Sequence, residues 1–246
     1  MRKVFLFILI ILIPVLASAL TAKEIIDRVD QNRIGENQYY KGKMVITKRN
    51  RKLIKTFEGY SKDSEDTFYM KFTNPEDKGV KYLKIDDQLW IYFPDADDVM
   101  KISGSMLRQG MMGSDLSYED MIRMDSIEEK YNTKLLGEKE FNGEKCYEVE
   151  LTAKDDAEDV TYYREVMLVH KEKFVMVQVD LFAKSGRLLK RMENTKIEEI
   201  DGKFVGTKVV IKDMKKKDTE TVMEFTEFDF NVELPEGVFT RNYLFR

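Results

Sequence analysis

The chain carries one acidic cluster whose spacing could support general acid–base chemistry. Asp115, Glu119 and Asp120 lie close together, so two of their carboxyl groups could act as proton donor and proton acceptor. The cluster follows Ser114 and Ser117 at the expected start of a short helix, where acidic side chains cap the helix and complement its dipole. No nucleophile elbow, metal-ligand spacing or phosphate-binding loop accompanies it. We therefore expect these acids to be structural and the protein not to be an enzyme.

The single histidine and the single cysteine, His170 and Cys146, both fall in strand-like patterns. One cysteine cannot form an intramolecular disulfide. A zinc site or a Cys–His nucleophile needs partners that the sequence near these two residues lacks. We expect both side chains to pack in the sheet, and we expect neither a metal nor a cofactor.

The stretch 89–124 combines residue types that could bind an apolar ligand. Two short strands, 89–93 and 99–103, precede a segment with Gly104, Gly110 and Gly113 and with five of the 14 methionines, Met124 among them. Glycine allows movement, and methionine adapts to variable apolar shapes. A long apolar insertion between strands needs either burial or a ligand, so core packing is the alternative. The predicted ligand-binding residues are Trp90, Tyr92, Phe93, Met106, Leu107, Met111, Met112, Leu116, Tyr118, Met121 and Ile122.

A helix is expected at the start of the predicted mature chain, because Thr21 and Glu24 have capping-box spacing. Ile25, Ile26 and Val29 then recur on one helical face, which predicts about three turns ending near residues 33–35.

The rest of the chain is typical of an antiparallel β meander with one short helix near 117–122. Besides 89–93 and 99–103, the predicted strands are 40–48, 52–60, 67–73, 80–86, 133–139, 146–152, 162–170, 174–183, 188–200, 204–212 and 219–230. Asn142-Gly143 and Asp201-Gly202 are two-residue hairpin signals. A sheet of this many strands must curl or close. Several strands are apolar on both faces, which indicates that helices cover the concave side.

The first 19 residues are typical of a cleavable signal peptide, with an uncleaved anchor as the alternative. Arg2 and Lys3 precede an apolar run, and Ala17-Ser18-Ala19 resembles a cleavage site. The 45 acidic residues outnumber the 41 basic ones, which argues against nucleic-acid binding, and the mixing of the two signs along the chain indicates an ordinary solvated surface. We expect residues 20–246 to form one soluble, monomeric domain outside the cytoplasm.

Four stretches have an order and spacing that resemble those of a known protein family: 90–94, 101–104, 112–120 and 239–244. Together they resemble the LolA-like group of periplasmic outer-membrane lipoprotein-sorting proteins, and the run from Gly113 to Asp120 is the most specific part. The resemblance covers most of residues 20–246. It implies a mainly β fold, a strongly curved antiparallel half-barrel of the LolA/LolB type with an N-terminal helix and a short helical lid insertion.

The resemblance also implies a function. Members of this group bind acyl chains of lipoproteins or lipids in a hydrophobic cavity and carry them from an inner-membrane transporter to an outer-membrane acceptor. A lid hinged on Gly104, Gly110 and Gly113 would admit and release the cargo. The alternative is a non-enzymatic envelope sensor or binding module on the same scaffold. The sequence leaves open whether the cargo is a lipoprotein or a free lipid.

Overall fold

The computed structural model describes residues 20–33, 37–62, 67–122, 130–155, 157 and 160–246. The predicted signal peptide (residues 1–19), Met124 and the segment just after the first helix lie outside the described residues. None of the described helices is long and apolar enough to cross a membrane.

Helix α1 (Ala22–Arg33) begins at the predicted capping box. The backbone N–H of Thr21 donates to Glu24 Oε2 at 2.7 Å, and the backbone N–H of Glu24 donates to Thr21 Oγ1 at 3.2 Å. These bonds from Thr21 hold the pKa of Glu24 below its usual range. The apolar stripe of the helix is buried against the sheet, as its spacing predicted.

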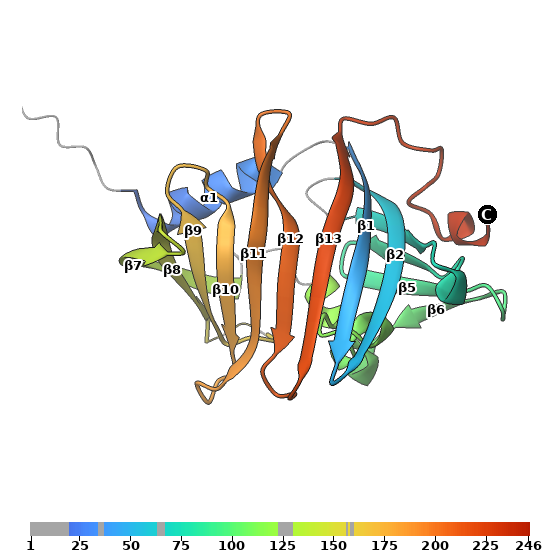
Figure 1. The fold of residues 1–246 in the computed structure, drawn as a ribbon, viewed down its shortest axis with the longest axis horizontal. Coiled ribbons are helices and arrows are strands. Elements are labelled where there is room, and N and C mark those ends of the chain that lie inside the picture. Colours follow the sequence, from blue (N-terminus) through green and yellow to red (C-terminus); the bar gives the residue numbers. More distant parts are fainter. Residues whose placement is uncertain (1–19, 34–36, 63–66, 123–129, 156, 158–159) are drawn as a thin grey trace, which may run out of the picture.

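The described residues form one continuous sheet of thirteen antiparallel strands, in the order β6-β5-β4-β3-β2-β1-β13-β12-β11-β10-β9-β8-β7. The strands are β1 (Asn37–Lys48), β2 (Arg51–Lys62), β3 (Thr67–Phe72), β4 (Lys81–Ile85), β5 (Gln88–Phe93), β6 (Asp98–Ile102), β7 (Tyr131–Phe141), β8 (Glu144–Ala153), β9 (Arg164–His170), β10 (Met176–Phe182), β11 (Leu188–Ile200), β12 (Lys203–Asp213) and β13 (Thr219–Phe230). β6 and β7 are the two edges, so the sheet is not closed into a barrel. Pairing of β1 with β13 joins its two halves at the centre (Figure 1).

Two predicted hairpins are confirmed by the backbone. Asn142 and Gly143 both have positive φ angles, 51° and 83°, and so do Asp201 and Gly202, 50° and 77°. Two-residue hairpin loops of this type need positive φ at both positions, which Asn-Gly and Asp-Gly tolerate well. These turns join β7 to β8 and β11 to β12.

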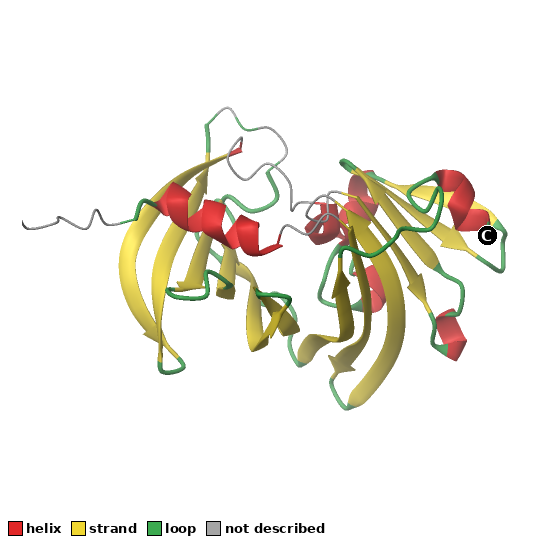
Figure 2. Ribbon diagram, turned by 90° about the horizontal axis from the view of Figure 1, so that it is seen from above, coloured by secondary structure: helices red, strands yellow, loops and turns green. Residues whose placement is uncertain are grey.

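The sheet is strongly curved, and helices lie on its concave side (Figure 2). α1 covers one half, where Ile25 and Val29 join a core cluster with Val149 and Leu181. Residues 104–122 cover the other half and comprise the 3₁₀ turns η3 (Gly104–Arg108) and η4 (Met111–Gly113) and helix α2 (Tyr118–Ile122). Their side chains belong to a second core cluster built on β1–β6. The predicted half-barrel with an N-terminal helix and a helical insertion is therefore confirmed.

The C-terminal segment covers the opposite face of β3–β5. It ends in the 3₁₀ turn η5 (Arg241–Phe245), and a further turn, η2 (Pro75–Asp77), joins β3 to β4. Val238 and Leu244 are buried against this face of the sheet. The buried Lys81 donates from Nζ to the main-chain oxygen of Leu244 at 2.7 Å. Burial lowers the pKa of Lys81.

Candidate functional site

A cavity of about 310 Å³ lies on the concave side, bounded by α1, residues 104–122 and the central strands. That volume is at the lower end of the range of small-molecule sites, roughly 300–1,000 Å³. The lining is predominantly apolar and consists of Val29, Asn32, Gln38, Tyr40, Phe57, Ser61, Phe68, Met70, Met111, Leu116, Asp120, Met121, Phe174, Val175, Met176, Met192, Asn194, Phe204, Val205, Gly206, Val209, Ile211, Met223, Phe225, Phe228 and Phe230. The cavity therefore lies where the two halves of the sheet meet.

A cluster of aromatic rings forms part of the cavity wall. Phe225 packs edge-to-face on Tyr40, Phe57 and Phe228, with ring centroids 5.9 Å apart in each pair. Edge-to-face packing is a favoured geometry for aromatic pairs. Because these rings come from β1, β2 and β13, the wall depends on pairing between opposite ends of the sequence.

Few polar side chains reach the cavity. Ser61 Oγ donates to Gln38 Oε1 at 3.2 Å, and Asn194 Nδ2 donates to the carbonyl oxygen of Met176 at 2.6 Å. Asn194 Oδ1 is buried and accepts no hydrogen bond from the described residues. A ligand with an N–H or O–H group beside an apolar chain could satisfy this acceptor.

The structure brings three of the predicted ligand-binding residues, Met111, Leu116 and Met121, to the cavity wall. Five others support the same region without lining it: Met106, Leu107, Met112, Tyr118 and Ile122.

The hydroxyl of Tyr82 links two of these supporting residues. It lies 3.2 Å from Met112 Sδ and 3.3 Å from the hydroxyl of Tyr118. Burial raises the pKa of Tyr82. Met112 and Tyr118 therefore pack in the core, which was the alternative to ligand binding.

Trp90, Tyr92 and Phe93, which were predicted to bind the ligand, do not line this cavity. Side chains alternate along β5, so Leu89 and Ile91 face residues 104–122. Trp90 and Tyr92 face the other way and pack against the C-terminal segment. Phe93 is at the end of the strand and is 36% exposed.

Most of the cavity wall was not anticipated from the sequence. The apolar residues of β12 and β13 contribute the largest share, together with those of β1–β3 and β10–β11. The signal that could have found them is the apolar character of both faces of 219–230, since a strand of this kind must be covered on both sides.

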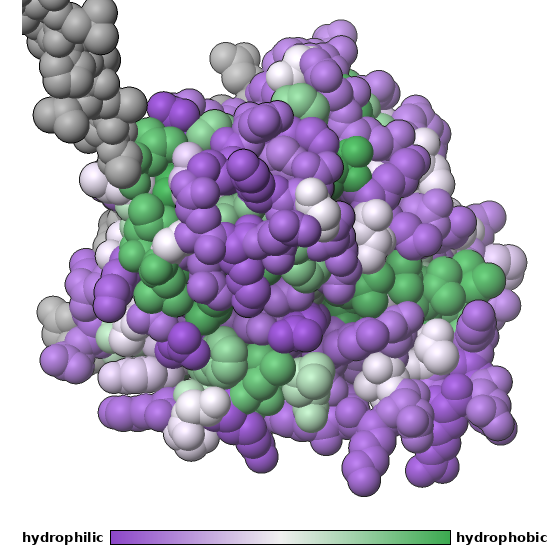
Figure 3. Space-filling view, turned by 60° about the vertical axis from the view of Figure 1, so that its left-hand side comes forward, coloured by the Kyte–Doolittle hydropathy of each residue, from purple (hydrophilic) through white to green (hydrophobic). Residues whose placement is uncertain are grey.

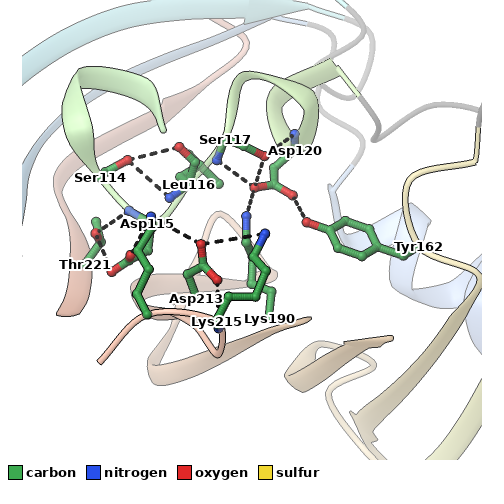
Figure 4. A network of polar contacts seen from close by, with 11 residues as sticks. Ser114, Asp115, Leu116, Ser117, Asp120, Tyr162, Lys190, Asp213, Lys215 and Thr221 are labelled. Carbon is green, nitrogen blue, oxygen red and sulfur yellow. Dashed lines mark hydrogen bonds and ion pairs between the residues drawn. The ribbon is translucent and has the colours of Figure 1, made fainter. Parts of the chain in front are cut away.

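A buried ion pair joins residues 104–122 to the other half of the sheet (Figure 4). Asp120 of α2 pairs with Lys190 of β11, and their side chains are only 2% and 5% exposed. Asp120 also accepts hydrogen bonds of 2.7 Å from the backbone N–H and the hydroxyl of Ser117 and from the hydroxyl of Tyr162. Asp120 is also one of the residues that line the cavity.

The environment of Asp120 favours its ionised form. Burial alone would raise its pKa, but the charge of Lys190 and the hydrogen bonds from Lys190, Ser117 and Tyr162 outweigh burial and hold the pKa below its usual range. A proton donor or acceptor should titrate near the working pH. Asp120 is therefore suited to be a fixed structural anion, as its position at a helix start predicted.

Asp115 forms a second attachment, to β13 and the turn before it. Its backbone N–H donates to Thr221 Oγ1 at 2.9 Å, and its carboxylate accepts from Thr219 Oγ1 at 3.0 Å. Lys216 Nζ lies 3.3 Å from Asp115 Oδ1 and 3.2 Å from Asp213 Oδ2. The most specific motif of the sequence therefore fastens residues 104–122 to the sheet.

His170 and Cys146 are directly opposite each other on β9 and β8, a proximity that their sequence positions did not show. His170 Nδ1 accepts the backbone N–H groups of Glu172 and Lys173, each at 3.2 Å, so its lone pair is occupied. Burial raises the pKa of the Cys146 thiol. This pair lacks the free base and the thiolate that a Cys–His nucleophile needs. Within the described part of the chain, no group of three or more His, Cys, Asp or Glu residues could hold a metal ion.

Comparison with known proteins shows which solved structures this fold is similar to. A family model described as an uncharacterized protein matches residues 64–246. No curated protein matches the chain. Among solved structures, a DUF1329 family protein from Desulfovibrio piger is 29% identical, with a TM-score of 0.82 and coverage of 91% of this chain and 97% of that chain.

Two further solved structures share the fold. A putative outer membrane lipoprotein-sorting protein domain from Vibrio parahaemolyticus is 20% identical, with a TM-score of 0.80 and coverage of 91% of this chain and 97% of that one. A LolA superfamily protein from Nitrosomonas europaea is 22% identical, with a TM-score of 0.74 and coverage of 92% and 100%. At these identities the similarity establishes a LolA-like fold.

Proposed function

Because residues 64–246 place the chain in the family whose model is described as an uncharacterized protein, and because its fold is LolA-like, we propose that it is a carrier of acyl chains. It holds the acyl chains of a lipoprotein or lipid in the central cavity and transfers them between membranes, without enzymatic activity. The observation that carries this proposal is the apolar cavity bounded by α1, residues 104–122 and the central strands.

The physical driving force is the removal of methylene groups from water. Each buried methylene contributes roughly 0.8 kcal/mol, so a 16-carbon chain gains up to about 12 kcal/mol before losses of mobility. Binding of this strength retains a lipid through an aqueous compartment. Release then requires an acceptor or a movement of the protein that exposes the cavity.

Residues 104–122 are the part whose movement would open the cavity. They contribute Met111, Leu116 and Met121 to its wall. They are attached through Asp115 to β13 and through Asp120 to Lys190. Opening therefore requires breaking these two attachments, in addition to the hinge movement at glycines that the sequence predicted.

We place the carrier in the periplasm, as a monomer whose residues 20–246 act as one domain. The predicted signal peptide supports export, and the continuous sheet from β6 to β7 supports a single unit. One structural neighbour is a putative outer membrane lipoprotein-sorting protein domain. An inner-membrane transporter and an outer-membrane acceptor are the partners that this function needs.

The test is ligand analysis of the mature protein, purified gently from cells that export it. Native mass spectrometry with lipid extraction should reveal a bound lipid or acylated peptide, and delipidated protein should take up a fluorescent fatty-acyl probe. Val209→Trp, which fills the cavity, should abolish both.

Val210→Trp is the matched control, because Val210 is the next residue of the same strand and does not line the cavity. It should keep probe uptake. An empty protein that also fails to take up the probe contradicts the carrier function, as does equal uptake by the two tryptophan variants.

A further inference from the structure

One end of the sheet is positively charged, although the whole chain has a net charge of −4. Three hairpin turns lie at this end, at the bottom of Figure 1: β1–β2, β12–β13 and β10–β11. The first contributes Lys48, Arg49, Arg51 and Lys52, all exposed, with no acidic residue between them. Together with the other two hairpins, they concentrate cations on one edge of an otherwise acidic protein.

The β12–β13 hairpin adds three consecutive exposed lysines, residues 215–217, and the β10–β11 turn adds the exposed Lys184 and Arg187. The first two hairpins are in direct contact, because the backbone N–H of Arg49 donates to the carbonyl oxygen of Asp218 at 2.7 Å. Figure 3 shows long hydrophilic side chains projecting from the lower end of the molecule. The basic residues of the β1–β2 and β12–β13 hairpins therefore form one surface, whereas Lys184 of the β10–β11 turn lies near the exposed Asp155.

The same end exposes apolar side chains. Among the described residues, six large hydrophobic side chains are exposed, and three of them are here: Leu53 at 48%, Ile54 at 59% and Met214 at 47%. β3 pairs only with residues 57–62 of β2, so the tip of the β1–β2 hairpin extends past its neighbour. Basic residues alone would protect this free edge from pairing with other strands; exposed leucine and isoleucine do not serve that purpose.

The arrangement of Leu53 and Ile54 indicates what they contact. As consecutive residues of a strand they point to opposite faces, and they pair with Ile46 and Val45 respectively. A single flat protein surface cannot bury both faces of a hairpin tip. The interfacial layer of a membrane can surround it, with the lysine and arginine side chains reaching the headgroups.

We propose that this basic end, formed by the β1–β2 and β12–β13 hairpins, docks on an anionic phospholipid surface. The docked orientation places residues 104–122 beside the membrane, because Lys216 of the β12–β13 hairpin contacts Asp115. Phosphate headgroups would compete with Asp115 for Lys216. Docking thereby weakens one of the two attachments that hold residues 104–122 beside the cavity.

The experiment is co-sedimentation of the mature protein with vesicles of phosphatidylglycerol and phosphatidylethanolamine, compared with pure phosphatidylcholine vesicles. Binding should be at least about tenfold stronger to the anionic vesicles and should weaken as salt is added. The variant Arg51→Gln/Lys52→Gln/Lys217→Gln should lose roughly fivefold in affinity per removed charge. Leu53→Asn/Ile54→Asn should also weaken binding while preserving its salt dependence.

The control variant, Lys134→Gln/Lys139→Gln/Lys145→Gln, removes the same charge from β7 and β8 at the far edge of the sheet. It should bind as the unmodified protein does. All substituted side chains are exposed, so thermal unfolding should be unchanged in every variant. Equal binding to neutral vesicles, or equal losses in the two charge variants, would overturn the proposal and redirect the search to an acidic protein partner.

Discussion

Asp120 and Lys190, which are 70 positions apart in the sequence, form a buried ion pair that attaches α2 to β11 across the cavity. Neither charge can be solvated by water in this position, so each depends on the other. This pair makes the closed arrangement of residues 104–122 a defined state, and its properties can be measured.

Removing one partner of the pair should strongly destabilise the fold. Asp120→Asn replaces one of the two acceptor oxygens by an NH2 group, so either Ser117 or Tyr162 loses its acceptor, and it leaves a buried ammonium group beside a neutral amide. We expect a loss of about 3–5 kcal/mol in the free energy of unfolding, measured by urea denaturation. Lys190→Met should have a comparable cost.

The double variant Asp120→Asn/Lys190→Met completes a thermodynamic cycle. It contains no unpaired buried charge, so its loss should be clearly smaller than the sum of the two single losses. Simple additivity would show that the two side chains are not coupled, contrary to the geometry.

The pair also gives stability a defined pH dependence. Because the pKa of Asp120 is lowered in the folded state, the unfolded chain takes up a proton first as pH falls. The stabilisation is therefore fully present above the ordinary aspartate pKa of about 4, and it is lost as pH falls through the lower folded-state value. Urea titrations between neutral pH and about pH 3 should show a steeper loss for the unmodified protein than for the double variant. Parallel curves would contradict this assignment.

Trp90 offers a direct test of which face of β5 lies on the concave side of the sheet. It is the single tryptophan, it is 9% exposed, and it packs with Leu244 on the face away from the cavity. Saturation with an acyl ligand that does not absorb light should leave its emission maximum unchanged. Leu244→Ala should shift the emission to longer wavelength and cost about 2–5 kcal/mol. A ligand-induced shift of similar size would restore Trp90 to the binding site.

Gly110 is required by a close approach within residues 104–122. A Cβ atom at this position would lie 2.1 Å from the carbonyl oxygen of Ser114. Gly110→Ala should therefore displace η4 and cost about 1–3 kcal/mol, measured by thermal unfolding. It should also increase the rate of acyl-probe release, because Asp115, which attaches this segment to β13, comes shortly after η4 in the sequence and would be displaced with it. Ser105→Ala, at an exposed position of the same segment, is the control and should change neither quantity.

The secondary structure could be predicted from the sequence because its signals are local. The capping box at Thr21 and the Asn142-Gly143 turn depend on neighbouring residues, and both are present in the structure. The strand pattern and its two-sided apolarity indicated a curved, covered sheet, and the motif from Gly113 to Asp120 indicated its LolA-like type. Each of these features can be recognised before any distant contact is known.

The residues that form the cavity could not be predicted from the sequence, because only the tertiary structure brings them together. Which face of β5 points inward is set by strand pairing, and a shift of one residue would exchange Trp90 for Ile91. The cavity wall of β12 and β13 exists because β13 returns to pair with β1. The partner of Asp120 likewise has no local signature, since an ion pair over this separation forms only when the sheet places β11 beneath α2. Periodicity along the chain fixes the type of each element, whereas the relative positions of distant elements depend on packing that local patterns do not encode.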